Sequence, residues 1–303
     1  MRAFGWNLSG QTTVPSTLTN IVQLAGTSQG SFALKSDGTL TAWGAGATTE
    51  APTAGLAGVS AIAAASNAAL ALKTDGTLVQ WGLTGDGQRT NFPTSGTFTA
   101  ISGRYFHFLG VRSDGTVAVW GNDPAFPPLA QPPAGLTGVK AVAAGVGFDI
   151  ALKADGTVVG WNSTNATYAQ SATDKGQSRP PAGLSNVVAI AAGQFHALAL
   201  KADGTVVGWG GTRTGAANSF TVPANAQSGV IAIACGLEHS VVLKSDGTIV
   251  AWGGNSFGET IVPAGLAGVT RIAAGEYFTL AATGGTAPSP GTIGGGTGGG
   301  GGG

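Results

Sequence analysis

The chain has 303 residues, of which 53 are glycine and only 9% are charged, and its 14 basic residues balance 14 acidic ones. A neutral chain without a basic stripe lacks the phosphate contacts that dominate nucleic-acid binding, so we expect no nucleic-acid partner. The single Cys235 can form no internal disulfide, and its apolar surroundings predict a buried thiol. We find no apolar run long enough for a transmembrane helix and expect no membrane span.

The N-terminal stretch Arg2-Ala3-Phe4-Gly5-Trp6 opens a series of segments that end in tryptophan. Six further copies follow, each with a basic residue, a variable residue, Asp-Gly-Thr and then a tryptophan. The basic residues that open them are Lys35, Lys73, Arg112, Lys153, Lys201 and Lys244. Successive tryptophans are 37 to 48 residues apart, and such a self-similar period indicates a repeat architecture.

Each repeat predicts a small antiparallel sheet. Short apolar segments bounded by glycine, such as Val187–Gly193, predict a buried strand, because a helix would need about 10 residues or more. A second apolar run, Ala197–Lys201, follows, and Asp-Gly then supplies the two positive-φ positions of a tight hairpin turn. The β-branched run Thr205–Gly210 is the returning strand. A polar loop and a short Thr-Val-Pro strand, as at Thr221–Pro223, complete a predicted four-stranded meander, the unit of a β-propeller.

The number of repeats predicts seven blades. Six complete Asp-Gly hairpins are present, whereas the last repeat, Val269–Gly285, stops before a tryptophan strand. Overlaid on their tryptophans, residues 2–6 match Thr157–Trp161, so we expect residues 2–6 to pair with residues 279–282. That pairing would close the ring, which otherwise leaves two unpaired sheet edges in solvent. The predicted fold is all-β: a seven-bladed β-propeller of four-stranded antiparallel blades over residues 1–285.

The repeat resembles the RCC1 (regulator of chromosome condensation) repeat. The shared pattern is V-x-x-I-A-A-G-x-x-H-x-x-A-L-K-x-D-G-T-V-x-x-W-G, with His196 and His239 at the position of its histidine. The family's W-G-x-N-x-x-G-Q segment is echoed at Trp252–Gly258 and at Trp6–Gln11. This resemblance covers residues 1–285 and implies a propeller whose N-terminal strand completes the last blade.

Two connecting phrases, Gly10–Leu18 and Thr221–Gly236, resemble a bacterial, secreted branch of that family, which includes a β-lactamase inhibitor. The resemblance implies kinship of scaffold and favours an extracellular location, although we see no signal peptide at the start of the chain. The glycine-rich segment 286–303 cannot bury a core, and we expect it to be a disordered linker or tail.

Aromatic residues gather in the predicted loops between the first and second strands, on the face opposite the Asp-Gly turns. The predicted binding residues, with one from the long loop after Asn162, are Tyr105, Phe106, Phe148, Tyr168, Phe195, Tyr277 and Phe278. Aromatic side chains on a rigid concave face supply binding hot spots. For Phe148 and Phe278 the competing interpretation is that they fill gaps between blades. For Tyr105, Phe195 and Tyr277, nearer the loop tips, we expect exposure.

The other candidate sites have structural interpretations. His107, His196 and His239 occupy one position in three different blades, whereas a metal needs three or four ligands that converge. We therefore expect them to form structural hydrogen bonds to a loop. The Asp-Gly-Thr turns lie one per blade and cannot together give Ca²⁺ its six to eight oxygens. We find no nucleophile elbow or paired carboxylates and expect no catalytic residues, metal or cofactor.

The sequence therefore predicts a non-catalytic, monomeric propeller, not an enzyme, that binds a protein partner through its aromatic loops, in an inhibitor-like manner. One alternative is a carbohydrate- or cell-wall-binding module, since the same aromatics could stack on sugar rings. Another is a structural surface-display repeat domain joined through the glycine-rich tail. The sequence does not identify the partner.

Overall fold

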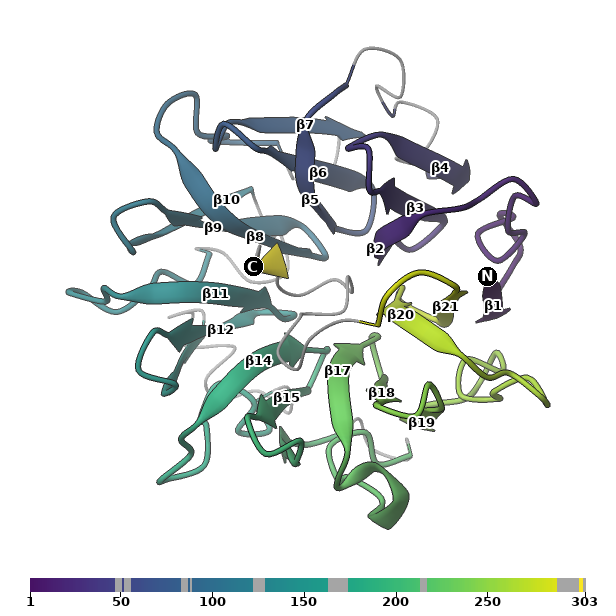
Figure 1. Ribbon diagram of the computed structural model, residues 1–303. Helices are drawn as coiled ribbons and strands as arrows, with labels where there is room; N and C mark the ends of the chain where they lie inside the picture. The colour runs from purple at the N-terminus through teal and green to yellow at the C-terminus, as the bar shows by residue number, and fades with distance from the viewer. Residues whose placement is uncertain are drawn as a thin grey trace.

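The computed structural model shows seven antiparallel sheets arranged radially around one axis (Figure 1). The described residues are 1–46, 51, 56–82, 87, 89–121, 129–162, 174–212, 217–287 and 300–301. Among the strands lies the 3-10 turn Ala224–Ala226. The described residues contain no helix that is long and apolar enough to cross a bilayer. The all-β, seven-bladed propeller is confirmed.

Six blades are each made of three consecutive strands, with the first strand nearest the axis (Figure 1). Blade 1 holds β2 (Ile21–Gly26), β3 (Gly30–Lys35) and β4 (Leu40–Gly44), blade 2 holds β5 (Val59–Ala64), β6 (Ala68–Lys73) and β7 (Leu78–Gly82), and blade 3 holds β8 (Phe98–Arg104), β9 (His107–Arg112) and β10 (Val117–Gly121). Blade 4 holds β11 (Val139–Ala144), β12 (Phe148–Lys153) and β13 (Val158–Asn162), blade 5 holds β14 (Val187–Ala192), β15 (His196–Lys201) and β16 (Val206–Gly210), and blade 6 holds β17 (Val230–Cys235), β18 (His239–Lys244) and β19 (Ile249–Gly253).

The seventh blade joins the two ends of the chain. Its inner strands are β20 (Val269–Ala274) and β21 (Phe278–Thr283), and its outer strand is the N-terminal β1 (Arg2–Gly5). Because β1 pairs antiparallel with β21, the predicted closure of the ring by the N-terminal strand is confirmed.

The register of that closing pair differs from the prediction by two residues. Phe4 lies opposite Thr279, just as Trp252 lies opposite Ser240 in blade 6, so Phe4 and not Trp6 takes the tryptophan position. A shift of two residues keeps the same face of the strand inward, because side chains alternate with period 2. Trp6 therefore lies beyond the end of β1.

The prediction of four consecutive strands in a blade was wrong, because the described residues form blades of three consecutive strands. The stretches Thr221–Pro223 and Ile261–Pro263, which both end in Val-Pro, form no strand. Each stretch ends in a proline, which has no N–H to donate to a ladder. The stretch still runs close beside its blade, since a Cβ on Gly208 of β16 would collide with the carbonyl oxygen of Phe220.

Blade 3 gains a fourth strand from elsewhere in the chain. Gly300 and Gly301 form β22 (Gly300–Gly301), which pairs with Ile101 and Ala100 of β8. They belong to the predicted linker 286–303, of which residues 288–299 and 302–303 lie outside the described part.

Apolar side chains fill the spaces between neighbouring blades. Phe32 of blade 1 packs edge-on against Trp81 of blade 2, with ring centroids 5.7 Å apart. Within blade 3, the fully buried rings of Phe108 and Trp120 stack at 6.0 Å. The predicted burial of Cys235 is confirmed, and burial raises the pKa of its thiol to about 12. Each blade is thus completed by its neighbours, as expected for a repeat that cannot bury its core alone.

The six Asp-Gly-Thr hairpins are present, with one correction to their type. In blade 5 only Gly204 is in the left-handed region (φ 79°), so the turn is a type I turn followed by a left-handed glycine rather than a turn with two positive-φ residues. Asp203 Oδ1 accepts hydrogen bonds from the Thr205 amide (3.0 Å) and hydroxyl (2.6 Å). The threonine thus belongs to the turn itself.

Candidate binding surface

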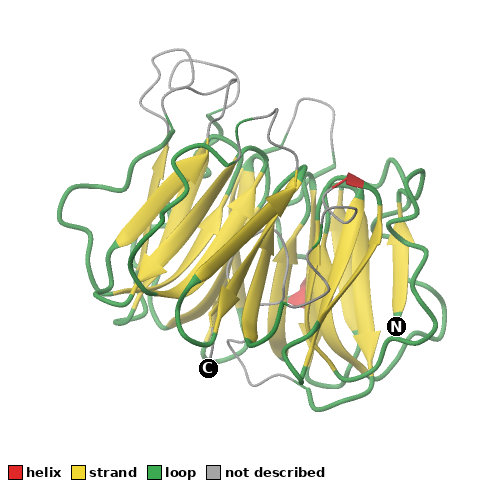
Figure 2. Ribbon diagram, turned by 90° about the horizontal axis from the view of Figure 1, so that it is seen from above, coloured by secondary structure: helices red, strands yellow, loops and turns green. Residues whose placement is uncertain are grey.

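The propeller has two different faces (Figure 2). Because neighbouring strands are antiparallel, all loops between first and second strands emerge on one face, which we call the loop face. The Asp-Gly-Thr turns emerge on the opposite, turn face. The segments that connect one blade to the next also begin on the loop face, where each third strand ends.

Backbone hydrogen bonds link neighbouring loops of the loop face. The Ser66 amide in blade 2 donates to the Tyr105 carbonyl in blade 3 (3.1 Å). Farther round, the Gln194 amide donates to the Leu237 carbonyl (2.8 Å) and the Leu237 amide donates to the Glu276 carbonyl (3.0 Å), which joins blades 5, 6 and 7. The floor of this face is therefore fixed by backbone contacts rather than by loose loops.

Three aromatic side chains meet on the loop face where the ring closes. Tyr277 lies 6.1 Å from Trp6 and 5.2 Å from Phe257 between ring centroids, and Trp6 lies 6.0 Å from Phe257. Phe257 is 48% exposed, and Leu8, two residues after Trp6, is 85% exposed. We call Trp6, Phe257 and Tyr277 the aromatic trio.

Sequence reasoning found only Tyr277 of the trio. Alignment of residues 2–6 on tryptophan places Trp6 in the closing strand, whereas alignment of Phe4-Gly5 on the Trp-Gly pairs places Trp6 in the loop after that strand. Phe257 stands inside the W-G-x-N-x-x-G segment quoted for the family resemblance, and its exposure could have been suspected there.

Two similar loops carry the missed residues. After β19, Asn255 Oδ1 accepts a backbone amide (3.1 Å) and the Glu259 carboxylate accepts the Phe257 amide (2.8 Å). After β1, Asn7 Oδ1 accepts a backbone amide (2.8 Å) and Gln11 Oε1 accepts the Ser9 amide (2.9 Å). These side-chain bonds hold both loops in a defined shape and so keep the trio in place.

A second aromatic group, the pair Tyr105 and Phe106, lies on blade 3. In this blade Arg104 pairs with His107, so only two residues remain for the loop, and Tyr105 adopts a left-handed φ of 54°. The two rings lie 4.3 Å apart, tilted by 62°. Both side chains are partly exposed. Both residues are among the predicted binding residues.

Three predicted binding residues are buried, and a fourth is not described by the structure. Phe148 and Phe278 are fully buried, which corrects their assignment and confirms the competing interpretation that they fill gaps between blades. Phe278 is buried because its ring packs directly against Gly275, the residue after β20, where a Cβ would collide with the ring. Phe195, predicted to be exposed, is only 9% exposed, because residues of the next blade, including Leu237, surround it. Tyr168 lies outside the described residues.

The comparisons with known proteins agree with this geometry. The family model of the regulator of chromosome condensation (RCC1) repeat matches residues 187–215 and 230–259, in blades 5 and 6. Human WBSCR16 superposes with a TM-score of 0.69 at 17% identity, over 93% of this chain and 99% of that one. The chain is thus a β-propeller in which two blades match the RCC1 repeat, and its overall fold resembles that of Prp20p.

Two other solved structures are similar to this RCC1-like propeller. Prp20p from Saccharomyces cerevisiae superposes with a TM-score of 0.68 at 18% identity, over 92% of this chain and 90% of that one. The CRINKLY WD40 ectodomain of the Arabidopsis thaliana receptor kinase ACR4 has a TM-score of 0.67 at 19% identity, over 88% and 92%. No curated protein sequence matches the chain.

The histidines of this RCC1-like propeller join one blade to the next. His196 of blade 5 contacts Ser240 of blade 6 (Nε2 to Oγ, 3.0 Å), and His107 of blade 3 contacts Asp149 of blade 4 (Nε2 to Oδ1, 2.8 Å). His239 reaches Thr279 in blade 7 in the same way (3.1 Å). The predicted structural hydrogen bonds are present, but they run to the neighbouring blade rather than directly to a loop.

Proton positions exclude the His196–Ser240 pair as a catalytic dyad. The Ser240 hydroxyl donates its proton to the Ser219 carbonyl (2.7 Å), so His196 Nε2 must be the donor in the His–Ser bond. A histidine that donates to the serine cannot act as its base. Burial also lowers the pKa of His196 to about 3. No three His, Cys, Asp or Glu side chains gather as a metal site within the described ranges.

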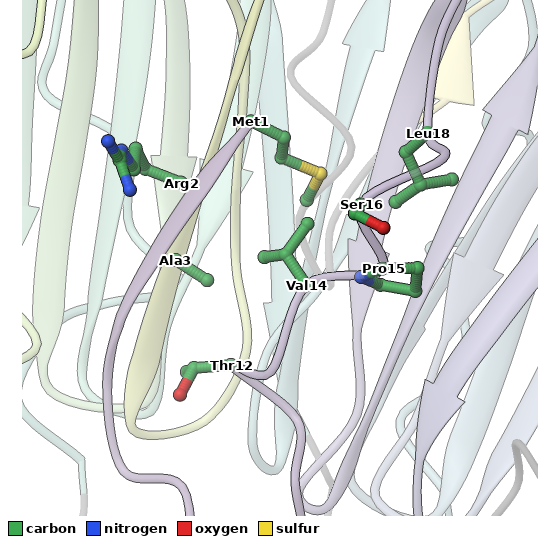
Figure 3. Close-up of a pocket in the computed structure, with 8 residues that line it drawn as sticks. All are labelled: Met1, Arg2, Ala3, Thr12, Val14, Pro15, Ser16 and Leu18. Carbon is green, nitrogen blue, oxygen red and sulfur yellow. The ribbon is translucent and has the colours of Figure 1, made fainter.

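A shallow pocket of about 320 Å³ lies at the outer rim (Figure 3). It is bounded by the start of β1, with Met1 and Arg2, and by the connection that includes Val14 and Pro15. Arg2 is the sole ionisable side chain among its lining residues. The pocket lacks an acid–base pair or a converging set of ligands, and we assign it no chemistry.

Proposed function

We propose that this RCC1-like propeller is a non-catalytic module that binds a protein partner through its loop face, centred on the aromatic trio. The observation that carries the proposal is the exposure of Phe257 and Leu8 beside Trp6 and Tyr277. Tyrosine and tryptophan bury a large area at a low entropic cost, which makes them frequent hot spots of protein interfaces.

Similar propellers support a protein partner. Prp20p, whose fold is shared, has binding properties to Gsp1p and histones, and yeast RCC1 (Prp20) has been crystallised with Kap60 bound. We propose that the present protein acts as a monomer. The resemblance to the secreted bacterial branch makes a secreted enzyme, held in an inhibitor-like manner, the first partner class to test.

The trio's geometry favours a protein over a carbohydrate. Sugar rings stack on open, flat aromatic faces, whereas the ring planes here are inclined to one another: 89° between Trp6 and Tyr277, 67° between Phe257 and Tyr277, and 41° between Trp6 and Phe257. Inclined rings form a ridged surface with edges and faces, which suits interdigitation with protein side chains.

An affinity capture from culture fluid and lysate of the source organism tests the proposal. Wild-type protein is compared with the triple variant Trp6→Ala, Phe257→Ala, Tyr277→Ala and with a matched control on the turn face, Lys73→Ala, Lys153→Ala, Lys201→Ala. A partner identified by mass spectrometry should then bind the wild type and the control equally in calorimetry. We expect at least roughly a hundredfold weaker binding by the trio variant.

The alternatives predict different outcomes of the same comparison. Retention of wild-type protein on a polysaccharide column, with elution by free sugar and loss in the trio variant, would identify a carbohydrate-binding module instead. Equal capture by the wild type and the trio variant would place the site elsewhere and contradict the proposal. If substitution of the exposed side chains over the whole loop face caused no loss of partner or polysaccharide binding, the structural surface-display role would remain.

A further inference from the structure

A fully buried arginine lies at the loop-side end of β8. Arg104 occupies the place where blades 4 to 7 carry the glycines Gly145, Gly193, Gly236 and Gly275. Its Nη2 donates to the Ala192 carbonyl of blade 5 (2.5 Å) and to the Cys235 and Gly236 carbonyls of blade 6 (3.0 Å each). One side chain of blade 3 therefore reaches two blades that are not its neighbours and closes the loop-side end of the axis.

A buried carboxylate makes a second connection of this kind. Glu276 of blade 7, which is 8% exposed, accepts a hydrogen bond from the Ser66 hydroxyl of blade 2 at 2.5 Å. Blades 2 and 7 are separated by blade 1. Burial raises the pKa of Glu276 and lowers that of Arg104 to about 10, so the guanidinium stays charged at neutral pH.

These contacts lead directly to the two aromatic groups. Ser66 also donates its amide to the Tyr105 carbonyl (3.1 Å), and Glu276 immediately precedes Tyr277 in the chain. Tyr105 follows Arg104, and Tyr277 is the centre of the aromatic trio. A continuous path of bonds therefore runs from the blade 3 pair through Ser66 and Glu276 to the trio.

We infer that Arg104, Ser66 and Glu276 are positioning residues that hold the aromatic pair and the aromatic trio as one preorganised surface across the axis. This inference rests on the proposed function, for which it specifies the kind of partner. The partner is a folded protein with a surface wide enough to touch both groups, rather than a peptide that occupies one loop. A fixed surface pays little ordering cost on binding, which is how preorganisation raises affinity.

Ser66→Ala is the sharpest test, because it removes only the hydroxyl and leaves the backbone bonds of Ser66 in place. Hydrogen exchange of the intact protein is followed by mass spectrometry, with Ser60→Ala as control. Ser60 lies at the turn-side end of β5 in the same blade and donates its hydroxyl to the Leu72 carbonyl (3.1 Å). We expect Ser66→Ala to raise exchange around Glu276 and Tyr277, two blades away, by roughly tenfold, since a buried hydrogen bond to the Glu276 side chain is lost. The control should leave exchange there unchanged.

Trp6 offers a spectroscopic readout of the same coupling. Acrylamide quenching of Trp6, taken as the difference between each variant and its Trp6→Phe counterpart, should increase in Ser66→Ala and not in Ser60→Ala. A second variant, Arg104→Met, keeps an apolar side chain of comparable length and should raise exchange at Tyr105 and in the loops after Ala192 and Cys235.

If Ser66→Ala alters exchange only in the loops of blades 2 and 3, and Arg104→Met only in blade 3, the coupling does not exist and the inference is overturned. These measurements need no partner, so they separate the two proposals. A trio variant that still captures the partner would refute the proposed function, whereas the exchange results would still decide whether the surface is coupled.

Discussion

Blades 5 and 7 have the same inner pair of strands but obtain the third strand differently. In both, the first strand pairs with the second through an equivalent register, with the same irregularity near its start. In blade 5 the turn Asp203–Thr205 leads directly to β16, whereas blade 7 has Gly284 and Gly285 there and takes β1 from the other end of the chain. The repeat thus determines the pairing of the two inner strands, whereas the non-covalent pairing of β1 with β21 closes the ring.

That difference also creates the candidate surface. In blade 5 the chain after the third strand continues with Gly211, but after β1 it continues with Trp6, which reaches Tyr277 and Phe257. The blade that departs most from the repeat therefore carries two of the aromatic trio, Trp6 and Tyr277, and the loop that leads into it from blade 6 carries the third, Phe257. The regular blades provide the frame, and the surroundings of the irregular blade provide the specific side chains.

Removal of residues 1–5 should have the largest effect, because it takes the outer strand from blade 7 and opens the ring. Loss of the Phe4 side chain and of the β1–β21 ladder should lower the free energy of unfolding by at least about 4 kcal/mol. Thermal denaturation checks this. A synthetic peptide of residues 1–8 should raise the melting temperature of the truncated protein with increasing concentration; a truncated protein that melts like the full chain would refute closure by β1.

Phe4→Ala and Trp6→Ala should differ in stability, because only Phe4 occupies the position of the blade tryptophans. Phe4 is 9% exposed within a core cluster, so its truncation should cost about 3 kcal/mol. Trp6→Ala should cost less than about 1 kcal/mol, as expected for a partly exposed side chain. Urea denaturation of both variants decides the register. The reverse order would mean that Trp6, and not Phe4, belongs to the blade.

His196 opens the second strand of blade 5, and Phe278 opens the equivalent strand of blade 7. The buried histidine should make the stability of the protein depend on pH. Burial lowers the pKa of His196 to about 3 from its ordinary value of 6.5, so between these values the unfolded chain binds a proton that the folded chain does not. The stability contributed by neutral His196 is therefore present above pH 6.5 and lost progressively as the pH falls toward 3. Burial also lowers the pKa of His239 to about 3, so His239 contributes to stability in the same pH range.

The double variant His196→Phe, His239→Phe tests this pH dependence. It should retain more of its neutral-pH melting temperature at pH 4.5 than the wild type does. Scanning calorimetry at both pH values provides the measurement, and parallel curves for the two proteins would contradict it.

The smallest expected effect concerns the turn of blade 5 that blade 7 lacks. Gly204→Val should be destabilising by roughly 1–3 kcal/mol, because a β-branched residue is strained at φ 79°. Thr205→Val should change stability less, since it removes a hydroxyl from an exposed turn. The Thr205 hydroxyl is the main cause that lowers the pKa of Asp203 to about 2. Carboxyl NMR titration of Thr205→Val should show the pKa of Asp203 rising toward its ordinary value.

Local sequence determined the frame of this protein. The Asp-Gly-Thr turns, the buried Ala-rich strands and the period between tryptophans depend on neighbouring residues, so the number of blades and the need for closure followed from the sequence. The structural role of His107, His196 and His239 followed as well, because one position repeated around a ring cannot converge on a metal.

Tertiary structure decided the features that depend on which segments meet. The register of β1 could not be chosen from alternation alone, since a shift of two residues leaves the same face inward. The burial of Phe195 depends on its contact with the loop of the next blade, and whether a Val-Pro stretch pairs with the strand beside it is likewise decided by how the two segments meet. Trp6, Phe257 and Tyr277 are far apart in the sequence, and Arg104 looks like an ordinary loop residue there. Only the closed ring brings the trio together and places the arginine among carbonyls across the axis, because both arrangements depend on contacts between blades rather than within one.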